Sequence, residues 1–89
     1  MSWTVEVMPR ALKALKKMDK PTARAIRDEL RAIEKLENPR SRGKALTGNL
    51  RGLWRYRVGD YRMICDILDD ELVVLAIEIA HRSEAYRRQ

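Results

Sequence analysis

The chain has 89 residues, 45% of them hydrophobic and 36% charged, a balance typical of one folded domain rather than a disordered segment. No apolar run approaches the roughly 20 residues of a membrane span, and the N-terminus lacks a signal-peptide layout, so we expect a single cytoplasmic domain over residues 1–89 with no membrane partner. Nineteen Lys and Arg against thirteen Asp and Glu give a net charge of +6, which favours nucleic acid or an acidic protein as partner.

The first third of the chain predicts a strand followed by two helices. Residues 3–8 alternate apolar and polar side chains, and Pro9 is placed to begin a helix that runs to about Met18. Pro21 begins a second helix, whose apolar stripe is Ala23, Ile26, Leu30, Ile33 and Leu36. The opposite side carries Arg24, Arg27, Arg31 and Lys35, which we interpret as a solvated face, with contact to RNA or to an acidic partner as the alternative.

The middle of the chain predicts a loop and then three strands. Residues 40–52 are rich in Gly, Ser and Asn, and their basic Lys44 and Arg51 are candidate phosphate contacts, although a solvated loop is the simpler interpretation. Strands are predicted over residues 53–58, 61–68 and 72–80, with Gly59-Asp60 as a two-residue hairpin turn. The predicted fold is α+β with the order β-α-α-β-β-β, an antiparallel sheet with an N-terminal helical hairpin packed on one face.

The predicted hairpin sets Arg57 directly opposite Arg62. Alternation turns Trp54 and Tyr56 toward the helices, whereas Arg55, Arg57 and Arg62 point to the open face of the sheet. Like charges opposite each other destabilise a sheet, so we interpret the pair as an anion site suited to phosphate. The alternative is a pair whose charge is relieved by an acidic neighbour, such as Glu78 or Asp66.

The last predicted strand has two possible registers. A three-residue turn at 69–71 puts Glu78 beside Arg62 and buries Val73, Leu75, Ile77 and Ile79, whereas a two-residue turn reverses the faces. We favour the first register because it buries the larger side chains.

Three residues after this strand are candidates for chemistry. His81, the only histidine, can act as a general acid or base, or can simply cap a helix or lie on the surface. Arg82 follows it, and Tyr86 could stack on a base or pack back on the sheet. Because no Cys/His spacing typical of a metal site occurs, we expect no metal and no other cofactor.

Three segments together resemble a known family. Residues 44–48 read KALTG, residues 52–62 read GLWRYRVGDYR and residues 79–86 read IAHRSEAY. They resemble the RelE/ParE superfamily of bacterial type II toxin–antitoxin toxins, in particular its RelE branch, and the order of strands and helices matches over nearly the whole chain. The resemblance implies a metal-independent, ribosome-dependent endoribonuclease that cuts mRNA by attack of a ribose 2′-hydroxyl on the adjacent phosphate.

The resemblance also implies roles for individual residues. Arg55 and Arg57 match the family's basic pair, and Arg62 matches the arginine that holds the scissile phosphate. Arg82 matches the basic residue after the last strand, and Tyr86 matches the tyrosine that stacks on a base. The best-known members have lysines in place of Arg55 and Arg57. Because arginine stays protonated in proteins, we expect these two to stabilise charge and His81 to transfer the proton.

The resemblance leaves two other functions open and implies a partner. A ParE-like toxin would inhibit DNA gyrase without nuclease activity, and a non-catalytic module would only bind RNA or protein. For the RelE branch, the expected partners are the ribosome, mRNA and a cognate RelB-like antitoxin. That antitoxin should be acidic and partly disordered alone, and should form a hetero-oligomer with the toxin.

Overall fold

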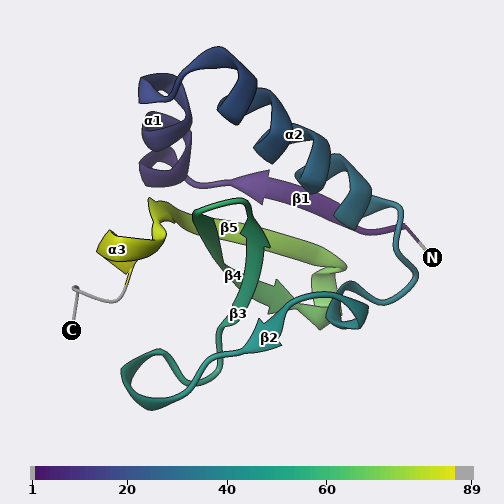
Figure 1. The fold of residues 1–89 in the computed structure, drawn as a ribbon. Helices are drawn as coiled ribbons and strands as arrows, with labels where there is room; N and C mark the ends of the chain where they lie inside the picture. The colour runs from purple at the N-terminus through teal and green to yellow at the C-terminus, as the bar shows by residue number, and fades with distance from the viewer. Residues whose placement is uncertain (1, 86–89) are drawn as a thin grey trace.

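The structure, a computed structural model, describes residues 2–85. The strands are β1 (Thr4–Val7), β2 (Lys44–Ala45), β3 (Trp54–Val58), β4 (Tyr61–Leu68) and β5 (Val73–His81), and the helices are α1 (Pro9–Lys17), α2 (Lys20–Glu34) and α3 (Arg82–Ala85). Three 3-10 turns, Pro39–Ser41, Gly48–Leu50 and Asp69–Glu71, lie in the connections. In Figure 1, α1 and α2 form a layer on one side of the sheet, and the short α3 leaves the end of β5.

The predicted α+β fold is confirmed, and the sheet differs from the prediction in two details. Five strands lie in the order β1-β5-β4-β3-β2, and β1 runs parallel to β5, so the sheet is mixed rather than antiparallel. Residues 44–45, which we predicted to lie in a loop, form the edge strand β2 beside β3. Both details depend on pairing between segments that no tight turn joins, and local alternation does not encode such pairing.

Tertiary contacts hold the two-residue strand β2 in place. Trp54 Nε1 donates a hydrogen bond to the carbonyl of Arg42 at 2.7 Å. Gly43 adopts a positive φ of 81°, and a Cβ there would lie only 2.3 Å from the carbonyl oxygen of Arg55. A residue with a side chain would therefore push β2 away from β3.

The core lies between the helices and one face of the sheet, as the helical stripes predict. Ala23, Ile26, Leu30 and Ile33 of α2 are buried, and so are Tyr56, Met63 and Cys65 from β3 and β4. The Tyr56 hydroxyl donates to the carbonyl of Pro39 at 2.7 Å, and burial raises its pKa. Burial also raises the pKa of the Cys65 thiol to about 12, so the thiol stays protonated and inert at neutral pH.

The register that we favoured for the last strand is wrong over its first half. Val74 and Ala76 join the core under the helices, whereas Val73 and Leu75 point to the other face. An irregularity opposite Ile64 and Cys65 then shifts the pairing, so that Ile79 returns to the core as predicted. The turn ends at Leu72 with a positive φ of 56°, and that conformation sets the register with which β5 begins.

Candidate nucleic-acid interface

The β3–β4 hairpin places two arginines side by side on the sheet face away from the helices. The pairing Val58↔Tyr61 and Arg57↔Arg62 is the register predicted from the Gly59-Asp60 turn, and Gly59 has the positive φ of 57° that such a turn requires. Directly opposite residues in an antiparallel pair point to the same face. Arg57 and Arg62 therefore lie together, opposite the buried side of the hairpin.

A second pair of cations lies beside the first. Lys44 of β2 pairs with Arg55 of β3, two residues before Arg57 on the same face. We call Lys44, Arg55, Arg57 and Arg62 the basic face. Strand β2 thus contributes a cation that a flexible loop would not hold in a fixed position.

The side chains of the basic face differ in exposure. Lys44 and Arg57 are exposed, whereas Arg55 and Arg62 are half-buried. Arg55 Nε and Arg62 Nη1 have almost no contact with solvent, although both side chains make further interactions in the structure. A guanidinium whose position is restrained by its surroundings can meet a phosphate with little loss of conformational entropy.

The carboxylate of Glu78 lies close to the basic face. Glu78 pairs with Ile64, which itself pairs with Arg55, so Glu78 lies one row away from Arg62 rather than directly beside it. It also forms an ion pair of 3.7 Å with Arg10 at the start of α1. Glu78 therefore offsets part of the positive charge, but it is shared with a cation outside the basic face.

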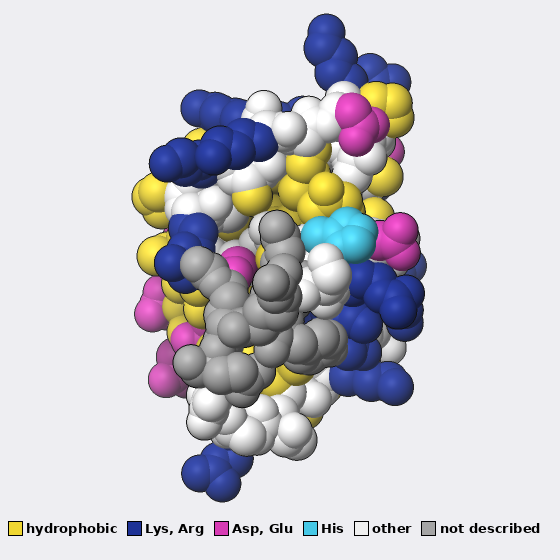
Figure 2. Space-filling model, turned by 60° about the vertical axis from the view of Figure 1, so that its left-hand side comes forward, with side chains coloured by type: hydrophobic (Ala, Val, Ile, Leu, Met, Phe, Trp, Pro, Cys, Tyr) yellow, Lys and Arg dark blue, Asp and Glu magenta, His cyan; other side chains and the backbone are white. Residues whose placement is uncertain are grey.

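The structure places His81 on the opposite face from the four cations. His81 pairs with Tyr61, and the two rings meet edge to face with centroids 5.5 Å apart. Figure 2 shows the histidine at a border, with hydrophobic side chains on one side and Lys and Arg side chains on the other. His81 is thus at the rim of the sheet and not among the arginines.

The His81 ring caps α3. The backbone N–H of Ser83 donates to Nδ1 at 3.3 Å, and the Ser83 hydroxyl lies 3.0 Å from the same nitrogen. Because Nδ1 accepts this N–H, the neutral ring carries its proton on Nε2. The ring therefore has an N–H donor to offer, and its acceptor nitrogen is engaged within the chain.

Two of the remaining predicted site residues, Arg51 and Arg82, are described by the structure, and neither belongs to the four cations of the basic face. The backbone N–H of exposed Arg82 donates to the carbonyl of Asp60, which joins the end of β5 to the hairpin turn. Arg51 is exposed at the end of the Gly48–Leu50 turn, and its N–H donates to Gly48 at 3.1 Å. Tyr86 lies outside the described residues.

Sequence reasoning missed three residues that shape this region. Tyr61 packs against the His81 ring, Ser83 holds its Nδ1, and Gly43 allows β2 to approach β3. The hairpin turn would have placed Tyr61, but its contact with His81 depends on the register of β5. Among residues 2–85, no group of three or more His, Cys, Asp or Glu side chains is arranged to hold a metal ion.

Comparison with known proteins settles the family. Residues 5–86 match the family model described as ParE toxin of type II toxin–antitoxin system, parDE. The chain belongs to the RelE/ParE family of toxins. This toxin is 40% identical over 79 residues to Toxin RelE of Mycobacterium tuberculosis, an alignment that covers 74% of this chain and 81% of the relative.

Solved structures agree with this family. The toxin superposes with a TM-score of 0.83 and 25% identity on a chain of the toxin–antitoxin complex RelBE2 from Mycobacterium tuberculosis, covering 92% of this chain and 100% of the other. It superposes with a TM-score of 0.73 and 26% identity on a chain of the archaeal RelE–RelB complex from Pyrococcus horikoshii. That superposition covers 94% of this chain and 99% of the other. Both of these homologues were crystallised as toxin–antitoxin complexes. No helix within residues 2–85 has the length and hydrophobicity needed to cross a membrane.

Proposed function

We propose that this toxin is a ribosome-dependent mRNA endoribonuclease whose basic face holds the scissile phosphate. The observation that carries the proposal is the placement of Arg57 opposite Arg62, beside the pair of Lys44 and Arg55. Such a cluster of like charges costs stability in a sheet, and an RNA phosphate is an anion that would offset this cost. The likeness to Toxin RelE supports the same branch of the family.

The proposed reaction is an internal phosphoryl transfer. The ribose 2′-oxygen attacks the adjacent phosphorus, the bond from phosphorus to the 5′-oxygen breaks, and the products are a 2′,3′-cyclic phosphate and a 5′-hydroxyl. Arg55, Arg57 and Arg62 would stabilise the charge that grows on the phosphate oxygens. Arg82, Lys44 and Arg51 would bind the flanking RNA backbone, and Tyr86 would stack a base.

Proton transfer is the proposed task of His81. The group that could donate to the leaving 5′-oxygen is Nε2–H of the protonated, imidazolium form of His81, which returns to the neutral ring as the proton leaves. Because Nδ1 is also protonated in that form, it would have to release the N–H of Ser83 that it accepts in this structure. Its position at the rim of the sheet suits a substrate whose phosphate lies on the basic face and whose leaving group extends over the edge. The arginines are always protonated and therefore cannot accept the proton of the 2′-hydroxyl. That proton would pass to solvent.

The partners follow from the same proposal. The substrate would be mRNA on the ribosome, and the neutralising partner would be a cognate RelB-like antitoxin in a hetero-oligomer. The net charge of +6 and the antitoxins crystallised with the homologues support an acidic protein partner.

A second candidate function is inhibition of DNA gyrase. It is favoured by one observation, that the matching family model is described as a ParE toxin. The two functions separate in one pair of assays. Mapped mRNA cuts in a translating extract with unchanged gyrase supercoiling support the nuclease, whereas intact mRNA with inhibited supercoiling supports the gyrase inhibitor.

A further inference from the structure

Strand β2 carries the lysine of the basic face, and its own pairing is short. It has two residues, it lies at the end of the strand order beside β3, and its Lys44 pairs with Arg55. Just beyond it, the N–H of Leu46 donates to the carbonyl of Leu53 at 3.0 Å. A pairing this short is marginal by itself, so contacts from outside the sheet decide how firmly Lys44 is held.

Helix α2 supplies such a contact through Glu29. Nη1 of Arg42 donates to both carboxylate oxygens of Glu29, at 3.1 and 3.0 Å. The Glu29 side chain is 23% exposed, so solvent screens this ion pair less than it screens pairs between fully exposed side chains. Because Arg42 lies two residues before Lys44, the ion pair ties the chain that enters β2 to the helical layer.

The backbone of Arg42 continues the connection to β3. Its carbonyl accepts the Nε1–H of Trp54, a residue of β3, at 2.7 Å. Gly43, which has a φ of 81°, lies against the same indole, because a Cβ there would be 2.6 Å from Trp54 Nε1. A continuous series of contacts thus runs from Glu29 on α2 to Lys44 on the basic face.

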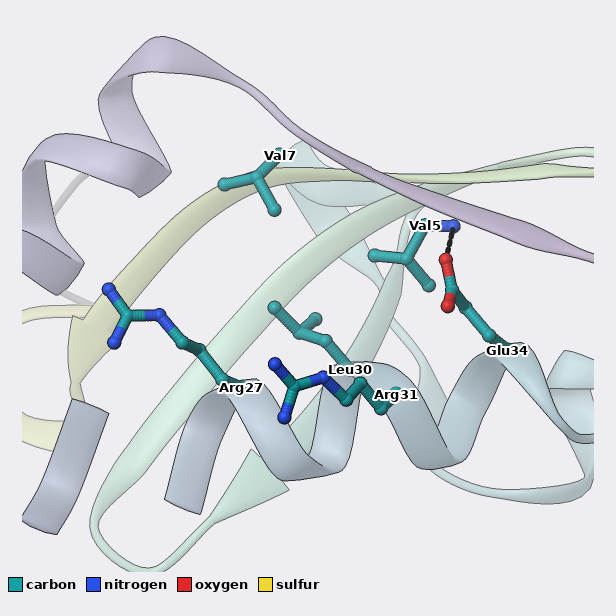
Figure 3. A pocket seen from close by; sticks show the side chains of 6 residues that line it. All are labelled: Val5, Val7, Arg27, Leu30, Arg31 and Glu34. Atoms are coloured by element: carbon teal, nitrogen blue, oxygen red, sulfur yellow. Dashed lines mark hydrogen bonds between the residues drawn. The ribbon is translucent and has the colours of Figure 1, made fainter. Parts of the chain in front are cut away.

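The same helix holds the opposite edge of the sheet in a comparable way. Glu34 of α2 accepts the backbone N–H of Val5 in β1 at 2.8 Å, the dashed line in Figure 3. Glu29 and Glu34 therefore each connect α2 to one of the two edge strands. The hydrogen bond of Glu34 holds a strand of the fold, whereas the ion pair of Glu29 holds a strand that carries a candidate RNA ligand.

The ion pair also keeps Arg42 away from the basic face. Continuing the pairing of β2 with β3 by two residues would set Arg42 opposite Arg57, on the side of the four cations. Glu29 instead draws the Arg42 side chain toward α2, which lies on the other side of the sheet (Figure 1). Loss of Glu29 could let Arg42 join the basic face or let β2 separate from β3, and the two outcomes have opposite effects on RNA binding.

We propose that Glu29 and Arg42 are positioning residues, which hold β2 against β3 so that Lys44 keeps its place on the basic face and binds RNA. The inference rests on the proposed function, because RNA binding is what gives the position of Lys44 a consequence. A partly exposed ion pair contributes little to global stability, but it can keep a short edge strand from opening while the rest of the domain stays folded. Its loss should therefore change RNA binding more than unfolding.

The first test measures mRNA cleavage in a translating extract at limiting toxin. Glu29→Ala should lower the initial rate by about threefold to tenfold, at a thermal midpoint near wild type. The substitution raises the net charge of +6 by one unit, so a nonspecific charge effect would instead strengthen RNA binding. The matched control is Asp28→Ala, which removes an exposed carboxylate of the same helix and should change the rate by less than about twofold.

A double-mutant cycle shows whether Glu29 acts through Lys44. Lys44→Ala should also lower the rate by about threefold to tenfold, and Glu29→Ala should add less than about twofold to that loss. The charge swap Glu29→Arg with Arg42→Glu should restore at least about half of the wild-type rate, because the ion pair can form in the reverse sense. Losses that multiply, a swap no better than its single variants, or a faster Glu29→Ala toxin would each overturn the proposal.

Hydrogen exchange at two indoles measures the position of β2 without any nuclease activity. The Trp54 indole donates to Arg42, and the Trp3 indole donates to the carbonyl of Glu37 at 3.2 Å, so Trp3 is an internal control. In Glu29→Ala, the Trp54 Nε1–H should exchange with solvent at least about fivefold faster than in wild type, whereas exchange at Trp3 should not change. Unchanged exchange at Trp54, or equal acceleration at both indoles, would overturn the proposal.

The outcome is separable from that of the proposed function. If wild-type toxin cuts mRNA and Glu29→Ala cuts it equally well, the nuclease stands and the positioning proposal falls. If wild-type toxin cuts no mRNA, the nuclease falls. The positioning proposal then stands only if Glu29→Ala speeds exchange at Trp54 and weakens binding of a short single-stranded RNA to the toxin.

Discussion

The two faces of the β3–β4 hairpin are made by alternate residues of the same two strands and have opposite properties. On the helix side, Tyr56, Met63 and Cys65 are almost completely buried. On the other side, Arg55, Arg57 and Arg62 form the basic face with Lys44. A period of two therefore divides one hairpin into a face that stabilises the fold and a face that we propose binds RNA.

The difference between the two faces of the hairpin explains how a small domain tolerates its cluster of cations. The apolar face and the helices supply the burial that holds the hairpin together, so the arginines opposite need not contribute to stability. Substitutions on one face should then change unfolding, and substitutions on the other should change catalysis.

The largest effect is expected on the buried face. Tyr56→Ala should lower the free energy of unfolding by about 3–5 kcal/mol, because it removes a buried ring and leaves the Pro39 carbonyl without its donor. Urea unfolding followed by tryptophan fluorescence measures the change. Tyr56→Phe is the control, and it should lose only about 1–2 kcal/mol. A Tyr56→Ala protein as stable as wild type would show that the helix side is not the stabilising face.

On the basic face, Arg62→Ala should reduce mRNA cleavage by a factor of about 10² to 10³ while the midpoint of thermal unfolding stays near wild type. The loss comes from charge stabilisation in the transition state. Cleavage is measured by primer extension in a translating extract. Arg24→Ala, an exposed arginine of α2, is the matched control. Wild-type cleavage by folded Arg62→Ala would remove this residue from the proposed site.

His81 lies at the rim of the sheet, and its substitution tests whether this residue serves catalysis or only the fold. His81→Asn can still cap α3 with its side-chain oxygen, but it cannot transfer a proton. The rate of mRNA cleavage should therefore fall by up to about a hundredfold, whereas the midpoint of thermal unfolding should not change. His81→Ala should lose both the cap and the proton donor. If His81→Asn cleaves normally and only His81→Ala is impaired, the ring acts as a cap alone.

The smallest effect is expected outside both faces, at the exposed ion pair of Arg40 and Asp69. The Arg40 guanidinium donates two hydrogen bonds to Asp69, at 2.8 and 2.9 Å, and holds the pKa of that carboxyl below its ordinary value of 3.8. A lowered pKa in the folded state stabilises the fold above that ordinary value, and the contribution disappears as the pH falls through the lower folded value.

Asp69→Asn should therefore lower the thermal midpoint slightly at neutral pH, and the difference from wild type should become smaller in acid. Differential scanning calorimetry at low salt, at about pH 7 and about pH 2.5, measures both. The neighbouring exposed Asp70→Asn is the control. A difference between Asp69→Asn and wild type that grows in acid would contradict the assigned role of Arg40.

The sequence by itself determined the local pattern of this protein. Helical periodicity and the two prolines predicted α1 and α2, and the turn at Gly59-Asp60 predicted the pairing of Arg57 with Arg62. These features depend on contacts between residues close in the chain, where spacing alone sets which side chains meet. The cationic pair at the centre of the proposed site was therefore predictable.

Only the tertiary structure decided the rest, because it depends on contacts between distant segments. Strand β5 reads as an almost continuous apolar run, since both of its faces are largely covered, and such a run does not specify its own register. The irregularity opposite Ile64 and Cys65 brings His81 to the face of Tyr61, and it belongs to the pairing of β5 with β4 rather than to the spacing of residues along β5. The parallel pairing of β1 and the two-residue strand β2 likewise needed partners that lie at least nine residues away along the chain.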